Sequence, residues 1–316
     1  MKRFLLLIYM CPLYTFSQQA TFRAHSHNDY KQPNPFQHAF ARGFSSIEAD
    51  VFLVKGRLLV AHEIGDTKEN RSLESMYLEP LSKELKKRRG KANDPSAPSF
   101  QLLIDVKSEA MTTLDAIVDL LKKFPDLTSR KEIRFTISGN RPPDDRYPAY
   151  PAFIFFDGRP GSNYTPEALK KVALISDSYA NYLLPGTRTP DSERAKKVVD
   201  AAHALQKPFR FWGNPDNEQT WELLAEIGTD YINTDDIDGL SAFMEKAKTN
   251  RIDKKIETAV LHDSLSLMPY NRMVRSAGNV VRFGDPALEN HALDVTPIVG
   301  NREGPYIATV DQNGTF

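Results

Sequence analysis

The chain has 316 residues, and its 41 Lys and Arg residues balance 41 Asp and Glu residues. With 41% apolar and 26% charged residues it has the composition of an ordinary globular protein, which excludes a disordered, collagen-like or coiled-coil chain. Without a net positive charge it lacks the electrostatic term that binds a nucleic-acid backbone, so we expect no nucleic-acid partner. The length allows one large barrel domain with a short appendage.

Residues 1–17 have the pattern of a secretory signal peptide. A basic start precedes an apolar run over 4–16, and small residues stand just ahead of residue 18. The run is shorter than the ~20 residues that cross a bilayer, so we expect export to the periplasm or the medium and no transmembrane segment. Cleavage would remove Cys11, the one cysteine, and leave 39 Lys and Arg against 41 Asp and Glu, a net charge of −2.

Short apolar strands alternate with helical stretches over residues 21–250. The strands are expected at 22–27, 46–54, 102–107, 133–138, 153–157, 174–177, 209–212 and 231–234. The helices between them are expected at 112–123, 166–172, 192–206, 217–227 and 240–248. Eight such β units predict an α/β fold, a TIM (β/α)8 barrel, and an open doubly wound sheet is the alternative.

Two parts of the chain do not follow this alternation. Residues 66–100 are polar and end in a basic helix at 81–89, so we expect a solvated insertion near the barrel mouth. Residues 257–316 carry Gly, Pro and Asn between short β-like runs, which predicts a short β-rich C-terminal extension.

Charged and imidazole side chains interrupt the apolar strands in pairs. Residues two apart in a strand point to the same face. Three pairs follow this spacing: His25 and His27, Glu48 and Asp50, and Asp105 and Lys107. Such groups are costly to bury alone, so each needs a salt-bridge partner or a bound cation.

The three carboxylates Glu48, Asp50 and Asp105 would make an oxygen-rich site that suits Mg²⁺ or Ca²⁺ better than zinc. A single strand carboxylate is more often a salt-bridge partner than a metal ligand. Three of them on one face of neighbouring strands favour the metal site.

Imidazoles and an ammonium group accompany these acids. His25 and His62 have side chains that titrate near neutral pH and suit proton transfer. Lys107 adds a fixed positive charge that can hold an anion. A cation, two imidazoles and an ammonium group together describe a site for a phosphodiester.

The order of these motifs resembles the glycerophosphodiester phosphodiesterase family, which belongs with the phosphatidylinositol-specific phospholipase C and sphingomyelinase D-like phosphodiesterases. The matching segments span residues 21–245 and lie at 24–25, 43–51, 59–63, 104–107, 211–214 and 222–235. The sequence of residues 25–30, His-Ser-His-Asn-Asp-Tyr, is most similar to a branch related to the altered inheritance of mitochondria proteins.

The resemblance implies a TIM barrel with Glu48, Asp50 and Asp105 as metal ligands. It further implies His25 and His62 as the acid–base pair; we expect His25 to be the base and His62 the acid, an order that the sequence does not determine. The substrate would be a small-molecule or lipid-derived phosphodiester.

The chain also departs from the family pattern. Ser26 and His27 stand where the family has Arg-Gly, which removes a guanidinium contact to phosphate and puts glycerophosphodiester specificity in doubt. His27 and Lys107 are the candidates to replace that contact, and Trp212 at a strand end is a candidate to stack on the substrate. Asp105 stands where many members have Glu. Residues 267–294 resemble the opening of a secreted β-propeller. The extension 257–316, of 60 residues, is too short to close one.

We therefore predict a secreted, monomeric phosphodiesterase that depends on Mg²⁺ or Ca²⁺. One alternative is an amidohydrolase-like metal hydrolase, because His25-x-His27 at the end of a first strand also opens that superfamily. The other is a non-catalytic barrel that binds lipid head groups or glycans.

Overall fold

The computed structural model describes residues 22–87 and 99–247 and four short segments, 265–268, 272–275, 292–298 and 306–311. The predicted signal peptide lies outside the described residues. The chain divides into two units, Met1–Glu245 and Lys246–Phe316. Within the described part, every helix is too short or too polar to cross a membrane.

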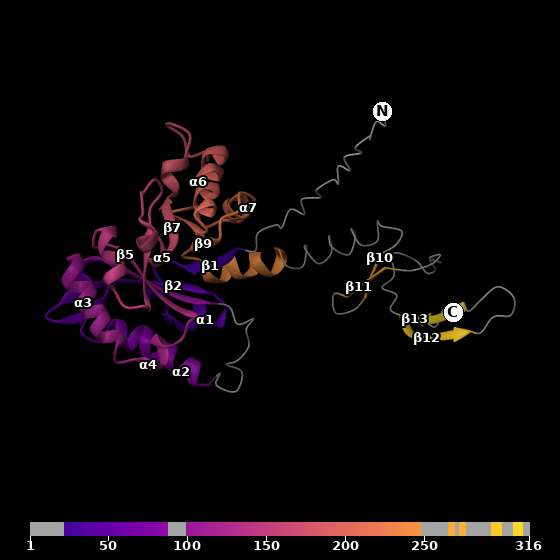
Figure 1. The fold of residues 1–316 in the computed structure, drawn as a ribbon, viewed down its shortest axis with the longest axis horizontal. Coiled ribbons are helices and arrows are strands. Elements are labelled where there is room, and N and C mark those ends of the chain that lie inside the picture. Colours follow the sequence, from indigo (N-terminus) through magenta and orange to yellow (C-terminus); the bar gives the residue numbers. More distant parts are fainter. Residues whose placement is uncertain are drawn as a thin grey trace, which may run out of the picture. The chain divides into compact units, whose positions relative to one another are not determined.

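Eight parallel strands of the first unit close into a barrel (Figure 1). Each strand pairs with its neighbours in chain order, and β1 pairs with both β2 and β9, which closes the ring. This closure confirms the predicted (β/α)8 barrel over an open sheet. The strands are β1 (Arg23–Ser26), β2 (Ser46–Val54), β4 (Phe100–Val106), β5 (Ile133–Gly139), β6 (Ile154–Gly158), β7 (Val172–Ser178), β8 (Phe209–Trp212) and β9 (Tyr231–Thr234).

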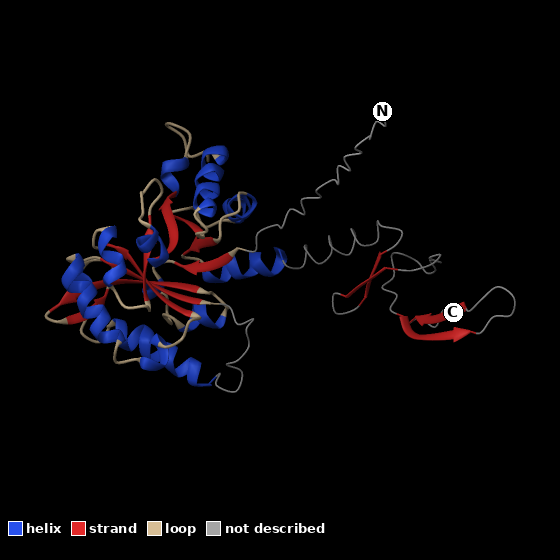
Figure 2. Ribbon diagram, viewed as in Figure 1, coloured by secondary structure: helices blue, strands red, loops and turns tan. Residues whose placement is uncertain are grey.

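Helices cover the outside of the barrel (Figure 2). Several begin where a side chain caps the free amides of the first turn: Glu109, Thr165, Asp191 and Asn217 accept such hydrogen bonds. The helices are α1 (Gln37–Ala41), α3 (Ala110–Leu121), α4 (Pro125–Thr128), α5 (Pro166–Lys171), α6 (Ser192–Ala204), α7 (Glu218–Glu226) and a last helix at 237–247. Short 3-10 turns are η1 (Asp29–Lys31), η2 (Ile64–Asp66), η4 (Asp144–Ala149) and η5 (Tyr179–Tyr182).

A short strand, β3 (Arg57–Val60), folds back antiparallel on β2 outside the barrel ring. The turn between them places Lys55 and Gly56 at φ 48° and 76°, the left-handed conformation that a tight hairpin requires. No strand was predicted from the sequence at these residues. Beyond β3, the Ala61 amide donates to the Asp50 carbonyl at 3.3 Å, so the hairpin returns the chain to the acidic end of β2.

The segment after β3 corrects the prediction of a solvated insertion at 66–100. It forms a π-helical turn, η3 (Glu74–Leu78), followed by α2 (Glu79–Lys87). Leu73, Tyr77 and Leu78 have no exposed surface and join the main hydrophobic core. These apolar residues are dispersed among charged ones at helical spacing, so the segment's average polarity hid its buried face. Residues 88–98 lie outside the described residues.

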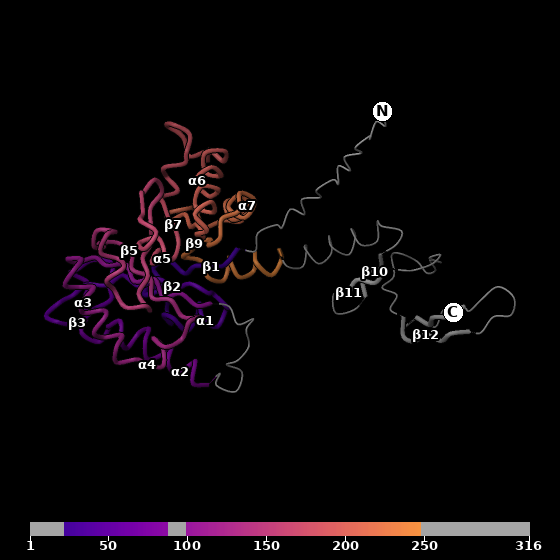
Figure 3. The backbone as a smooth tube through the Cα atoms, in the orientation of Figure 1, coloured from indigo at the N-terminus to yellow at the C-terminus, as the bar shows by residue number. Residues whose placement is uncertain are grey.

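Side chains alternate between the outside and the inside of each barrel strand. In β2, Ile47, Ala49 and Val51 pack in the core beneath the helices, and the intervening Glu48 and Asp50 face the barrel interior. At the opposite end of the interior an apolar layer is formed by Phe155, Leu174 and Tyr231. Figure 3 follows the chain path that brings the first and last strands together. The barrel interior is therefore apolar at one end and charged at the other.

The described C-terminal segments form two antiparallel hairpins. β10 (Leu265–Met268) pairs with β11 (Arg272–Arg275), and β12 (Ala292–Ile298) pairs with β13 (Tyr306–Asp311). These strands confirm the β-rich extension, and the resemblance to a β-propeller stays a prediction.

Replacing Leu78 by alanine tests the burial of the segment after β3. Because Leu78 is fully buried, we expect L78A to lower the free energy of unfolding by about 2–5 kcal/mol. Leu205 is 42% exposed, so the matched variant L205A should change it by about 0.5 kcal/mol or less. Urea unfolding measures both, and equal midpoints for the two variants would show that the segment is not part of the core.

Candidate active site

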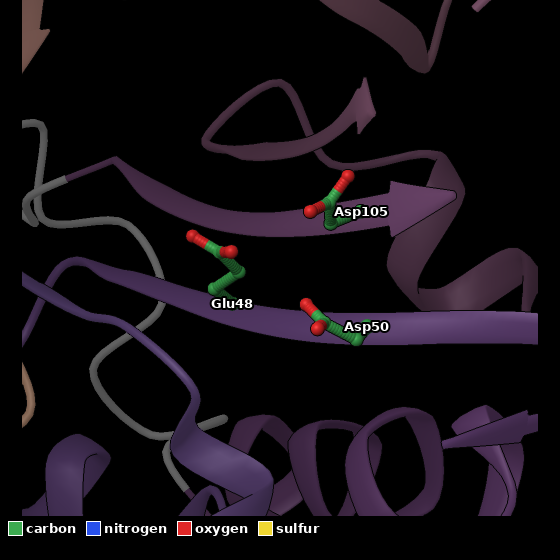
Figure 4. Close-up of side chains that lie close together, drawn as sticks. All are labelled: Glu48, Asp50 and Asp105. Carbon is green, nitrogen blue, oxygen red and sulfur yellow. The ribbon is translucent and has the colours of Figure 1, made fainter. Parts of the chain in front are cut away.

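Three carboxylates lie together where β2 and β4 run side by side (Figure 4). Glu48 and Asp50 come from β2, and the register sets Asp105 of β4 beside Asp50. One oxygen from each lies within 4.8 Å of the others. Asp50 Oδ1 and Asp105 Oδ1 are buried without a hydrogen-bond partner in the described part of the chain. Buried carboxylate oxygens left unpaired in this way fit a hard cation such as Mg²⁺ or Ca²⁺.

Lys107 and Tyr30 compensate part of the charge of this cluster. Lys107 Nζ lies 2.6 Å from Asp105 Oδ2 and 3.2 Å from Asp50 Oδ2, and the Tyr30 hydroxyl donates to Asp50 at 2.8 Å. Burial and the neighbouring Glu48 nevertheless raise the pKa of Asp50 to about 6, and the same causes raise the pKa of Asp105. The ammonium group of Lys107 therefore does not neutralise the three carboxylates. A divalent cation would compensate the remaining negative charge.

Arg210 of β8 holds Glu48 inside the barrel. Its Nη1 lies 2.8 Å from Glu48 Oε2 and 3.2 Å from Asn233 Oδ1, and the guanidinium is 3% exposed. Burial disfavours the charge of Glu48, but Arg210 and His25 outweigh it and hold its pKa well below the usual range. Sequence reasoning missed Arg210, although a charged residue alternating with Phe209 and Phe211 carried the same signal that identified Glu48.

His25 is completely buried beneath the cluster. Its Nδ1 lies 2.7 Å from Ser46 Oγ, its Nε2 lies 2.8 Å from Glu48 Oε2, and Arg210 Nη1 is 2.5 Å from that same Nε2. Burial, followed by the charge of Arg210, lowers the pKa of His25 to about 4. A neutral His25 thus positions Glu48, and its predicted role in proton transfer is not tested by this geometry.

A cavity of about 320 Å³ opens over the three carboxylates. Every site residue predicted from the sequence lines it except His25: Glu48, Asp50, Asp105, His27, His62, Lys107 and Trp212. Trp212, at the end of β8, is 38% exposed, as a residue that stacks on a substrate must be. Arg159 and Arg210 also line the cavity, and neither was predicted.

His27 follows β1 at the edge of this cavity. Its Nδ1 lies 2.8 Å from Asp235 Oδ1, just beyond β9, and its side chain is 28% exposed. Burial opposes the imidazolium charge, but the Asp235 hydrogen bond and the charge of Glu48 outweigh it, so the pKa of His27 is raised. A carboxylate that holds Nδ1 orients the ring and fixes the tautomer, the arrangement that suits an acid–base histidine. The sequence did not single out Asp235 because its contact depends on barrel closure.

His62 reaches the cavity from the β2–β3 hairpin instead of from a barrel strand. Its side chain is 50% exposed, and its Nδ1 lies 3.2 Å from Glu63 Oε1. The hairpin register brings this end of β3 beside Asp50. Two imidazoles, on His27 and His62, therefore line the cavity above the carboxylates.

Comparison with known proteins shows a similarity to phosphodiesterases. A family model described as an AIM6-like phosphodiesterase domain matches residues 15–130, and a model of the glycerophosphoryl diester phosphodiesterase family matches residues 208–238. Altered inheritance of mitochondria protein 6 of Eremothecium gossypii is 29% identical over 270 residues, 70% of this chain and 69% of that protein. The homolog from Arthroderma benhamiae is 26% identical over 281 residues, 73% of this chain and 88% of that protein.

Among solved structures, a glycerophosphodiester phosphodiesterase from Parabacteroides distasonis aligns with a TM-score of 0.47 and 17% identity, over 74% of this chain and 99% of that one. The two family models match the segments that carry the acidic cluster and the end of the barrel, β8 and β9. Together with the curated relatives, they show that the chain is similar to the glycerophosphodiester phosphodiesterase-like superfamily of phosphoric diester hydrolases, and within it to the altered inheritance of mitochondria proteins.

Proposed function

We propose that the chain is an exported, divalent-cation-dependent phosphodiesterase that cleaves a small-molecule or lipid-derived phosphodiester by histidine acid–base catalysis. The observation that carries the proposal is the shared cavity, in which three carboxylates lie together with His27 and His62. Carboxylate oxygens hold a hard cation, and imidazoles move protons near neutral pH.

The residues that would hold the cation are Glu48, Asp50 and Asp105. A cation bound there would polarise the phosphoryl oxygen and lower the pKa of a nearby hydroxyl. Arg210 and His25 keep Glu48 ionised and fixed in position before any cation arrives. Lys107 and Arg159, on the same cavity wall, can contact the non-bridging phosphoryl oxygens.

Proton transfer is assigned to His27 and His62. One imidazole accepts the proton of the attacking hydroxyl as the new P–O bond forms, and the other gives a proton to the departing alkoxide. This assignment replaces the predicted His25 with His27, because both ring nitrogens of His25 already contact protein groups and its side chain does not line the cavity. His62 keeps its predicted place in the pair.

The amidohydrolase-like alternative finds less support. It requires a cation on His25 and His27, yet the Arg210 guanidinium lies 2.5 Å from His25 Nε2 and would repel a cation there. In the described part of the chain, the candidate metal cluster consists of carboxylates alone. A non-catalytic barrel would not need an imidazole paired with a carboxylate at the cavity, as His27 is with Asp235.

Cation removal tests the proposed chemistry. EDTA should abolish hydrolysis of a panel of phosphodiesters, and Mg²⁺ or Ca²⁺ should restore it, because the clustered carboxylates would otherwise repel the phosphate. Activity that persists in EDTA would overturn cation dependence, and cation binding with no turnover on any diester would favour the non-catalytic barrel.

A substitution at a glycine of β5 provides a second test of cation binding. Gly139 has φ +64°, and a Cβ at this position would lie 1.9 Å from Asp105 Oδ1, so G139A should displace the carboxylate and weaken cation binding at least tenfold by calorimetry. Gly186 has a similar φ of +71° with nothing within 4 Å, so G186A carries the same backbone cost and should bind the cation normally.

Replacing each cavity histidine should identify the acid and the base. We expect H27N and H62N each to lower kcat on an alkyl phosphodiester by about 10²–10⁴, whereas H203N, on an exposed helical histidine, should not. On a p-nitrophenyl diester, whose leaving group needs no proton, the variant that lacks the acid should recover most of its rate. Full activity of H27N on the alkyl ester would return the role to His25.

The N-terminal segment supports export. Cleavage of residues 1–17 should give a mature protein that begins at Gln18, which mass spectrometry of the exported protein can measure. L6R, which places a charge in the apolar run, should keep the full-length precursor inside the cell. An exported protein that retains residues 1–17 would contradict cleavage.

A further inference from the structure

A second and larger cavity lies beside the first. It has a volume of about 760 Å³ and is lined by residues that follow β4, β5 and β6, among them Asn140, Arg141, Tyr147, Arg159, Ser162 and Tyr164. Lys107, Gly139 and Arg159 line both cavities, so the second is continuous with the space over the carboxylates. A group bound in it would therefore be attached to, or adjacent to, a phosphodiester held at the first.

The charges beneath this second cavity do not balance. Asp157 of β6 is fully buried, and its Oδ2 lies 2.9 Å from Arg159 Nη1 and 3.8 Å from Arg210 Nη2. Arg141 Nη1 donates to the backbone carbonyl of the same Asp157. Two guanidinium groups, on Arg159 and Arg210, thus contact the Asp157 carboxylate, and Glu48 pairs with Arg210 as well. Of the three, Arg141 is the guanidinium without a carboxylate partner among the described residues, and both Arg141 and Arg159 line the second cavity.

The acidic residues that line the second cavity form no ion pair with Arg141 in the described part of the chain. Glu109 also lines this cavity. Its carboxylate accepts hydrogen bonds from the amides of Met111 and Thr112 at 2.9 and 2.8 Å and so caps the start of α3. Asp144 is the other lining carboxylate. Among the described residues, no carboxylate oxygen lies within ion-pair distance of Arg141, so its charge is available to a ligand.

Arg159 is held rigidly. Its Nη1 donates to the Gly158 carbonyl at 2.9 Å and to Ser176 Oγ at 3.0 Å, in addition to its contact with Asp157, and the side chain is 33% exposed. A fixed guanidinium beside a second one forms the planar, forked donor set that binds phosphate and carboxylate groups. Preorganisation of this kind lowers the entropy cost of binding an anion.

We propose that Arg141 and Arg159 form an anion subsite in the second cavity, which receives a second anionic group, a phosphomonoester or a carboxylate, on one arm of the substrate. The preferred substrates are then phosphodiesters that carry an additional negative charge. This inference rests on the proposed phosphodiesterase function for its kinetic consequence, whereas the subsite itself does not.

Binding of inorganic phosphate to the cation-free full-length protein tests the subsite directly. Without a cation the three carboxylates repel phosphate, so heat of binding at low ionic strength reports the second cavity. We expect R141Q to weaken binding at least tenfold and R141K to weaken it less, because lysine keeps the charge and loses the fork. R188Q removes the same charge from an exposed loop and should bind phosphate within twofold of the unmodified protein.

A matched pair of substrates tests the specificity. The p-nitrophenyl diesters of glycerol 1-phosphate and of glycerol 1,3-bisphosphate differ by one phosphoryl group. We expect the ester with the additional phosphomonoester to have at least a tenfold higher kcat/KM, mainly through KM, and R141Q to reduce this ratio to about one while R188Q preserves it.

Three outcomes separate the proposals. Phosphate binding that is absent, or equally tight in R141Q, would overturn the subsite. Hydrolysis of both esters at equal rates would support the phosphodiesterase function and overturn the specificity. Phosphate binding that depends on Arg141, with hydrolysis of neither ester, would support the subsite while contradicting the proposed reaction.

Discussion

A buried guanidinium organises the charged end of this barrel. Arg210 enters from β8, is 3% exposed, and lies between the Glu48 carboxylate of β2 and the Asp157 carboxylate of β6. A charge so deeply buried is stable only when partners surround it, so Arg210 fixes both acids and they fix it. His25 completes this group, with its ring between Ser46 and Glu48. The proposed metal ligands and the proposed anion subsite thus lie on opposite sides of one ion network.

This network gives different positions to residues that the sequence pattern had grouped together. His25 and His27 are two residues apart on one strand, yet His25 is closed off inside the network, and His27 reaches the cavity with Asp235 behind it. Similarly, Glu48 is held by protein groups, whereas Asp50 and Asp105 each keep a buried oxygen without a partner. The groups deeper in the barrel therefore support the site, and the groups nearer the cavity can contact a ligand.

Much of this arrangement could be predicted from the sequence. The alternation in β2 placed Glu48 and Asp50 on one face, and the register with β4 depends on the same alternation, so the acidic cluster was predictable. Arg210 alternates with apolar residues in β8 as clearly as Glu48 does in β2. Its role could not be predicted, because the sequence does not show that Glu48 and Asp157 face it across the barrel. Asp235, Arg141 and Arg159 follow strand ends in segments without periodicity, so loop geometry, and not strand pattern, decides where their side chains lie. The buried face after β3 was hidden because polar residues outnumber Leu73, Tyr77 and Leu78 there.

The closure of the barrel has a consequence for the order in which the protein folds. The contact between Arg210 and Glu48 joins residues 162 positions apart, and that between His27 and Asp235 joins residues 208 apart. Contacts of such high sequence separation are slow to form, because a long loop must close before they stabilise the chain. An intermediate that lacks β8 and β9 would hold Glu48 without Arg210 and His27 without Asp235. The ion network around Glu48 and the pair of His27 with Asp235 should therefore be completed only when β8 and β9 join the barrel.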